Sequence, residues 1–174
     1  MTLLNVKAKN HPQQVGRRGA DDATDDRRTP DELWESLHER FQFTMDVAAS
    51  AANTKCPAFY DVKLDGLTSD WYGSIWCNPP YSDLNAWVRK AWQEMQGDDD
   101  CRSIVMLVPA NRTEQKWWQQ CVEPHRDGRT PGNPYLTVRF LAGRLRFNRP
   151  GWTKPTKGDR PPFGLCLLIW ERDV

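Results

Sequence analysis

The segment over 103–108, which is apolar at every position after Ser103, constrains the fold of this chain more than any other feature. It reads Ser-Ile-Val-Met-Leu-Val and predicts a strand that is covered on both faces of its sheet. A second apolar run, over 163–170, predicts another buried strand. Strands alternate with helical patterns up to residue 122, and paired strands follow. This order favours an α/β fold with a mostly parallel sheet and an antiparallel C-terminal hairpin.

Local signals place the remaining elements. Thr29, Pro30 and Glu32 form a capping-box pattern, which predicts a helix over about 30–40. Ser82 and Thr113 are candidate caps for two later helices whose apolar residues recur at helical spacing. The other expected features are a short strand over 41–46, a tight loop over 48–52 that enters a helix, turns at 65–66 and 69–70, a buried strand over 73–77, and a hairpin that pairs 136–141 with 145–147.

Size and composition limit the class of protein. The chain has 174 residues, 39% of them hydrophobic, which suits one domain with a packed core. Residues 1–28 are polar and charged, so we expect a disordered N-terminal tail before a single domain over 29–174. Nothing approaches a membrane span in length or resembles an apolar leader, so we expect a cytoplasmic protein. Five scattered cysteines favour neither a disulfide framework nor a metal site.

The motif that carries chemistry is Asn78-Pro79-Pro80-Tyr81, directly after the buried strand at 73–77. Ligands of open α/β sheets bind at the carboxyl ends of strands, and two prolines hold the backbone there in a fixed conformation. The Asn78 side-chain oxygen and the Pro79 carbonyl can each accept a hydrogen bond from an amino group, while the Tyr81 ring covers a planar substrate. Two such acceptors pull a conjugated amine toward tetrahedral geometry, which frees its lone pair for attack. A merely structural turn is the alternative.

The motif resembles the catalytic segment of amino-group methyltransferases that use S-adenosylmethionine. More of the chain is similar to one branch, the Dam-like phage family of DNA N6-adenine methyltransferases. The similar segments occur in order between residues 29 and 170, at 29–30, 43–49, 53–55, 65–67, 70–73, 76–82, 87, 108–109, 117–118 and 143–147. The resemblance implies a Rossmann-like methyltransferase fold, S-adenosylmethionine as cofactor with no metal, and a flipped adenine of DNA as substrate.

The resemblance also implies roles for individual residues. The adenine site would comprise Asn78, Pro79, Pro80 and Tyr81. The cofactor site would comprise Thr29, Asp46, Ala48, Ala49, Asp70 and Trp71. Many methyltransferases have a glycine-rich loop after the first strand, but residues 47–50 here read Val-Ala-Ala-Ser. We therefore expect a cofactor loop of a different shape or of weaker binding. Asp65 is interpreted as a turn residue rather than a ligand.

Charge is distributed unevenly along the chain. Residues 1–101 hold 11 basic and 17 acidic side chains, whereas 102–174 hold 13 basic and 6 acidic ones. The basic half predicts a surface that contacts DNA phosphates. Its candidate residues are Arg144, Arg146, Phe147, Arg149, Lys154 and Lys157, with Arg160 nearby. Phe147 is a candidate second ring against the target base, and a core position suits it equally well.

Other functions stay open from the sequence alone. The same motif suits a glutamine amide of a protein or the N4 amine of cytosine, although serine commonly replaces asparagine in the cytosine enzymes. A non-catalytic nucleic-acid-binding module is a further alternative. The sequence does not indicate which DNA sequence would be methylated. A monomer is favoured. If the chain is phage-borne, the expected location is the cytoplasm of the bacterial host.

Overall fold

The computed structural model describes residues 28–97, 100–126, 135–147 and 161–172. Six strands form one sheet in the order β2-β1-β3-β4-β6-β5. Their bounds are β1 Met45–Asp46, β2 Ala58–Phe59, β3 Gly73–Cys77, β4 Cys101–Pro109, β5 Tyr135–Phe140 and β6 Leu165–Glu171. Pairing is parallel from β2 through β4, and β6 runs antiparallel to both β4 and β5. The α/β, Rossmann-like fold with a mostly parallel sheet is confirmed.

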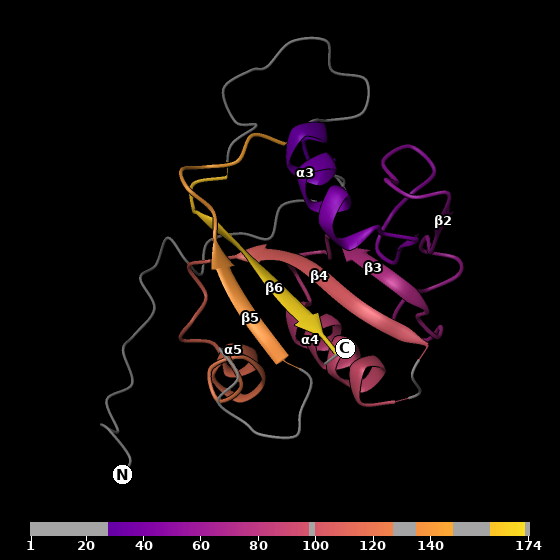
Figure 1. The fold of residues 1–174 in the computed structure, drawn as a ribbon. Coiled ribbons are helices and arrows are strands. Elements are labelled where there is room, and N and C mark those ends of the chain that lie inside the picture. Colours follow the sequence, from indigo (N-terminus) through magenta and orange to yellow (C-terminus); the bar gives the residue numbers. More distant parts are fainter. Residues whose placement is uncertain (1–27, 98–99, 127–134, 148–160, 173–174) are drawn as a thin grey trace.

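Helices cover both faces of the sheet (Figure 1). Helix α3 (Asp31–Phe41) packs on one face, and helices α4 (Leu84–Gln96) and α5 (Lys116–Cys121) pack on the other. The apolar run in β4 explains this arrangement, because successive strand residues point to opposite faces. Ile104, Met106 and Val108 join the core beneath α4 and α5, while Val105 and Leu107 join the core beneath α3. All five are fully buried, as expected for a strand inside a three-layer fold.

The parallel arrangement determines where a ligand can bind. Strands β1 to β4 point the same way, so the loops that follow them meet at one edge of the sheet. Strand β2 lies on one side of β1 in the sheet, and β3, which comes next in the chain, lies on the other side of β1. The loops after β1 and β3 therefore diverge, and such a switch point is the usual ligand crevice of an open α/β sheet.

Three helix starts differ from the predictions. Pro30 occupies the N-cap position of α3 and no side chain caps that helix, so the capping box at Thr29 is wrong. The Thr29 side chain is buried instead, and its hydroxyl has no partner among the described residues. Asp83 rather than Ser82 caps α4, accepting a hydrogen bond from the Ala86 N–H at 3.4 Å. Helix α5 begins after Gln115 rather than at Thr113.

Two predicted strand and helix segments also differ. Helix α3 extends to Phe41, and the strand expected over 41–46 is reduced to Met45–Asp46. Gln42 ends the helix in the left-handed region, where its side-chain amide donates to the His38 and Glu39 carbonyls. No helix follows residues 48–52, which form turns before β2. The antiparallel C-terminal hairpin is present, but β5 pairs with β6, and residues 145–147 form no strand.

Candidate active site

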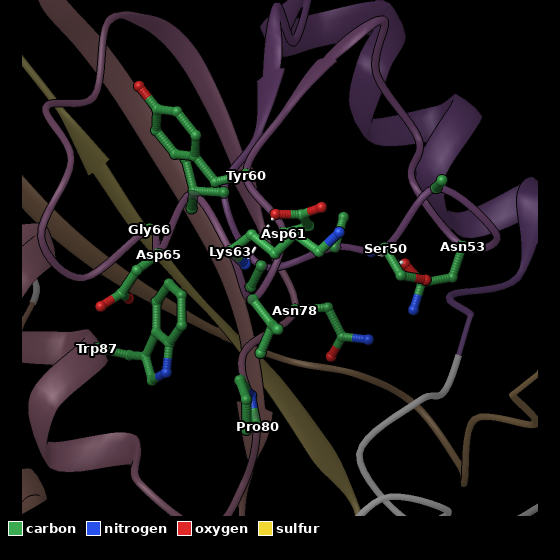
Figure 2. A pocket seen from close by; sticks show the side chains of 15 residues that line it. Ser50, Asn53, Tyr60, Asp61, Lys63, Asp65, Gly66, Asn78, Pro80 and Trp87 are labelled. Carbon is green, nitrogen blue, oxygen red and sulfur yellow. Dashed lines mark hydrogen bonds between the residues drawn. The ribbon is translucent and has the colours of Figure 1, made fainter.

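A pocket of about 690 Å³ lies at the carboxyl ends of β1, β2 and β3. Its volume is within the usual range for small-molecule and cofactor sites. Figure 2 shows that most of the side chains around it come from the three loops that follow these strands, while Trp87 comes from helix α4. The lining residues are Val47, Ala48, Ala49, Ser50, Ala51, Asn53, Tyr60, Asp61, Val62, Lys63, Asp65, Gly66, Asn78, Pro80 and Trp87.

The glycine-free loop after β1 is held by side chains. Asp46 accepts hydrogen bonds from the Ala48 N–H at 3.4 Å and the Lys55 N–H at 3.1 Å. Asn53 accepts one from the Ser50 N–H at 2.7 Å. Among the described non-glycine residues, only Gln42 and Asp65 have positive φ. The loop therefore turns without the left-handed conformation that favours glycine.

Asp46 lies beneath the pocket rather than on its surface. Its side chain is almost wholly buried, and burial raises its pKa to about 6, although the hydrogen bonds from Lys55 and Ala48 act in the opposite direction. The Lys55 ammonium forms an ion pair with Asp31, at the start of α3. The Asp46 carboxylate thus fixes the pocket loop, and Lys55 joins that loop to α3.

Glycine is required in the loop after β2, not in the loop after β1. A Cβ atom at Gly66 would lie 2.1 Å from the Val47 carbonyl oxygen and 3.2 Å from the Trp87 ring. The close approach brings the two loops together on one side of the pocket. The Gly66 carbonyl also accepts a hydrogen bond from the Trp71 indole at 2.7 Å. Trp71 itself is buried in the core, where its ring stacks on Trp87.

Two carboxylates line the pocket wall. Asp61 follows β2 and accepts hydrogen bonds from the Lys63 and Leu64 N–H groups at 2.9 and 3.0 Å, which lower the pKa of its carboxyl. Asp65 has a φ of 44° and accepts a hydrogen bond from the Leu67 N–H at 3.0 Å. Asp65 is therefore the predicted turn residue, and it also borders the pocket.

The Asn78–Tyr81 segment forms the side of the pocket that follows β3. Asn78 and Pro80 line the pocket, whereas Pro79 is buried. The Tyr81 hydroxyl donates to the Asn78 side-chain oxygen over 3.5 Å. The Tyr81 ring lies 6.3 Å from the Phe163 ring, centroid to centroid, at an angle of 57°. The motif thus extends from the pocket to Phe163, which precedes β6.

A smaller cavity lies on the other side of Asn78. Its lining residues are Thr29, Asp46, Ala48, Asn53, Lys55, Trp76 and Asn78. The Thr29 hydroxyl here is buried, and within the described part of the chain it has no hydrogen-bond partner. An orphaned buried hydroxyl costs free energy unless something binds it. Thr29, Asp46 and Asn78, predicted from distant parts of the sequence, therefore meet at one place.

Other predicted residues lie elsewhere. Asp70 is exposed, and its main-chain carbonyl accepts a hydrogen bond from the Tyr60 hydroxyl at 2.7 Å. Arg144 and Arg146 are exposed in the segment after β5. Phe147 is buried in the core beneath α3, the second of its two predicted positions. Arg149, Lys154, Lys157 and Arg160 lie outside the described residues, as does most of the predicted tail over 1–28.

Sequence reasoning missed several lining residues, including Ser50, Tyr60, Asp61, Lys63 and Trp87. Asp61 carried one usable signal, since it is an acid just after a strand, but β2 is only two residues long and no pattern revealed it. Trp87 was among the positions similar to the family but was given no role, because a tryptophan on the apolar face of α4 also suits the core.

The described residues contain no group of three or more His, Cys, Asp and Glu side chains that could hold a metal ion. Within the same residues, no helix has the length and apolar character needed to cross a membrane.

Comparison with known proteins places the chain in a family. Two phage proteins named DNA N-6-adenine-methyltransferase are similar to it. The protein of Escherichia phage T1 is 35% identical over 89 residues, which cover 49% of this chain and 36% of that protein. The protein of Haemophilus phage HP1 (strain HP1c1) is 33% identical over 82 residues, which cover 47% of this chain and 46% of that protein. The matches thus span less than half the length of either relative.

Among solved structures, the 23S rRNA methyltransferase ErmE is similar with a TM-score of 0.36 and 11% identity, over 84% of this chain and 51% of that one. That likeness is too weak to bear on what this chain does. The family model for DNA N-6-adenine-methyltransferase (Dam) matches residues 18–171, nearly the whole sequence. The chain therefore belongs to the Dam family of DNA N-6-adenine-methyltransferases.

Proposed function

We propose that the chain methylates the N6 amine of adenine in DNA, with S-adenosylmethionine as the methyl donor. The observation that carries this proposal is the position of Asn78. Its side chain borders both the large pocket and the small cavity, at the carboxyl end of β3. An amine acceptor held there would lie beside any cofactor in the pocket, which is the alignment that methyl transfer needs. Membership of the Dam family supports adenine as the target.

The residues of the pocket fit S-adenosylmethionine. The Asp61 carboxylate can accept hydrogen bonds from ribose hydroxyls, and the Trp87 ring offers an apolar surface beside it. The small residues over 48–51 let a ligand approach the main chain closely. The unpartnered Thr29 hydroxyl can bind the polar end of the methionine part. When bound, the cofactor supplies a methyl group on a sulfonium.

The Asn78–Tyr81 segment would bind the adenine. The Asn78 side-chain oxygen and the Pro79 carbonyl would accept the two N–H groups of the amine, and the Tyr81 ring would stack on the base. An amide oxygen is too weak a base to take the amine proton, so Asn78 orients the amine and the proton leaves to water. The adenine must first leave the duplex, at a cost of a few kcal/mol. We expect Arg144 and Arg146, with basic residues outside the described ranges, to hold the phosphates.

The test combines cofactor binding with methyl transfer. Calorimetry should detect S-adenosylmethionine binding to the full chain, and labelled cofactor should transfer its methyl group to DNA. Asn78→Ala should lower the transfer rate at least 100-fold, on the order seen for loss of one transition-state hydrogen-bond partner, while the cofactor Kd stays nearly constant. Methylation of a protein amide or of cytosine instead would favour those acceptors. Absence of cofactor binding would favour a non-catalytic module, and an active Asn78→Ala variant would contradict the mechanism.

A further inference from the structure

Two residues of the Asn78–Tyr81 segment, Pro79 and Pro80, cannot donate a main-chain hydrogen bond. The ladder between β3 and β4 ends at Cys77. Beyond this point the Pro80 carbonyl accepts a hydrogen bond from the Asp83 N–H at 3.3 Å. A segment that must aim two oxygens at one amine is held more firmly by each contact from a neighbouring segment.

Arg112 supplies such a contact. It lies in the loop after β4, which neighbours the loop after β3 because these two strands pair in parallel. Its guanidinium Nη1 donates a hydrogen bond to the Tyr81 main-chain carbonyl at 3.0 Å, in a partly buried position. Among the described residues no carboxylate forms an ion pair with Arg112. The main chain of Tyr81 is therefore the partner that the structure gives to this cation.

The loop that carries Arg112 is itself fixed at both ends. The Ala110 N–H donates to the Gly164 carbonyl at 2.9 Å, and the Gln115 N–H donates to the Arg112 carbonyl at 3.2 Å. Residue 164 adjoins Phe163, whose ring faces the Tyr81 ring. Three segments, after β3, after β4 and before β6, thus converge on Tyr81. Of these contacts, the hydrogen bond from Arg112 is the one with a charged donor.

We propose that Arg112 is a positioning residue that fixes the Tyr81 main chain, and with it the two acceptors at Asn78 and Pro79. The inference rests on the proposed function. A hydrogen bond to a charged group is among the stronger ones in proteins, and its loss lets the segment move relative to the pocket. Since Arg112 touches neither the pocket nor the cavity lining, its removal should change the transfer step and leave cofactor binding intact.

The test compares Arg112→Ala and Arg112→Lys with Arg89→Ala. Arg89 is a matched control, because it also donates hydrogen bonds, to Asn85 and Gln120, but on the exposed side of α4. We expect kcat at saturating DNA to fall about 10- to 100-fold in Arg112→Ala, with the cofactor Kd and the control unchanged. Lysine should restore part of the rate. Added guanidinium ion, far below unfolding concentrations, should restore activity to Arg112→Ala only.

Two results would overturn the proposal. One is a kcat within threefold of wild type in both Arg112 variants. The other is a loss confined to DNA affinity, with a shallower salt dependence and unchanged kcat, which would make Arg112 a phosphate contact. If Arg112→Ala does not fold, Arg112→Lys decides by the same criteria. A wild-type chain that binds cofactor but transfers nothing would refute the proposed function instead.

Discussion

Replacing Asp46 by asparagine tests how much the fold is destabilised by keeping the Asp46 charge buried beneath the pocket. Burial raises the pKa of Asp46 from its ordinary value of 3.8 to about 6. Since each tenfold change in proton affinity corresponds to about 1.4 kcal/mol, the ionised carboxylate costs the fold about 3 kcal/mol relative to the protonated one. Asparagine is neutral at every pH, so it lacks this cost.

The direction of the pH dependence follows from the linkage between proton binding and folding. The folded protein binds the Asp46 proton more tightly than the unfolded chain does, so this group stabilises the fold fully below pH 3.8. That stability is lost as the pH rises through about 6. Relative to wild type, the free energy of unfolding of Asp46→Asn should therefore increase by about 3 kcal/mol between the acidic and alkaline sides of this window. Effects of the amide that do not depend on pH cancel in the comparison.

Urea unfolding of both proteins across this pH range measures the difference. Asp61→Asn is the control of opposite sign, because hydrogen bonds to its carboxylate lower the pKa of Asp61. That group stabilises the fold above the ordinary pKa and loses its effect as the pH falls, so Asp61→Asn should lose stability relative to wild type as the pH rises. A difference for Asp46→Asn that stays constant with pH, within about 1 kcal/mol, would show that burial does not raise the pKa of Asp46.

Three further variants probe the pocket and the DNA surface. Gly66→Ala places a Cβ atom 2.1 Å from the Val47 carbonyl oxygen, so the loops after β1 and β2 must separate, at a cost of about 1–3 kcal/mol. Calorimetry should find S-adenosylmethionine bound at least tenfold more weakly. Unchanged affinity would show that the close approach of the two loops does not shape the cofactor site. Thr29→Val removes a buried hydroxyl without a described partner; we expect equal or higher thermal stability with weaker cofactor binding, and a less stable protein of normal affinity would show a structural role. Replacing Arg144 and Arg146 by glutamine should reduce the slope of log K against log salt for DNA binding by about 2, and an unchanged slope would place the phosphates elsewhere.

Strands with strong apolar patterns were predictable from the sequence. The strand at 73–77 has the predicted bounds, and the 103–108 run lies inside β4. Weak patterns were overridden by contacts between distant residues. The alanine-rich stretch after Asp46 forms turns because the Asp46 carboxylate binds the N–H groups of Ala48 and Lys55. Likewise, Leu145–Phe147 alternates like a strand, but Phe147 packs into the core beneath α3 instead.

The candidate site was predictable in part for the same reason. The Asn78–Tyr81 motif follows a recognisable strand, and Asp46 ends the strand expected over 41–46, which is reduced to Met45–Asp46. The structure brings Asn78, Asp46 and Thr29 to one cavity. Asp61 follows a strand of two residues, and Trp87 lines the pocket from a helix whose apolar face also builds the core. Neither position has a local pattern that distinguishes it, because the pocket exists only once β1, β2 and β3 are side by side.

Nucleoside analysis of cellular DNA is the direct test of whether this chain methylates adenine through Asn78. DNA from cells that express the full chain, or its Asn78→Ala variant, would be digested and the methylated nucleosides quantified by mass spectrometry in a host without its own adenine methylation. We predict N6-methyldeoxyadenosine with the wild-type chain and none above background with the variant. N6-methyldeoxyadenosine at equal levels in both would show that transfer does not depend on Asn78. Methylated cytosine in place of adenine would show that the chain acts on another base.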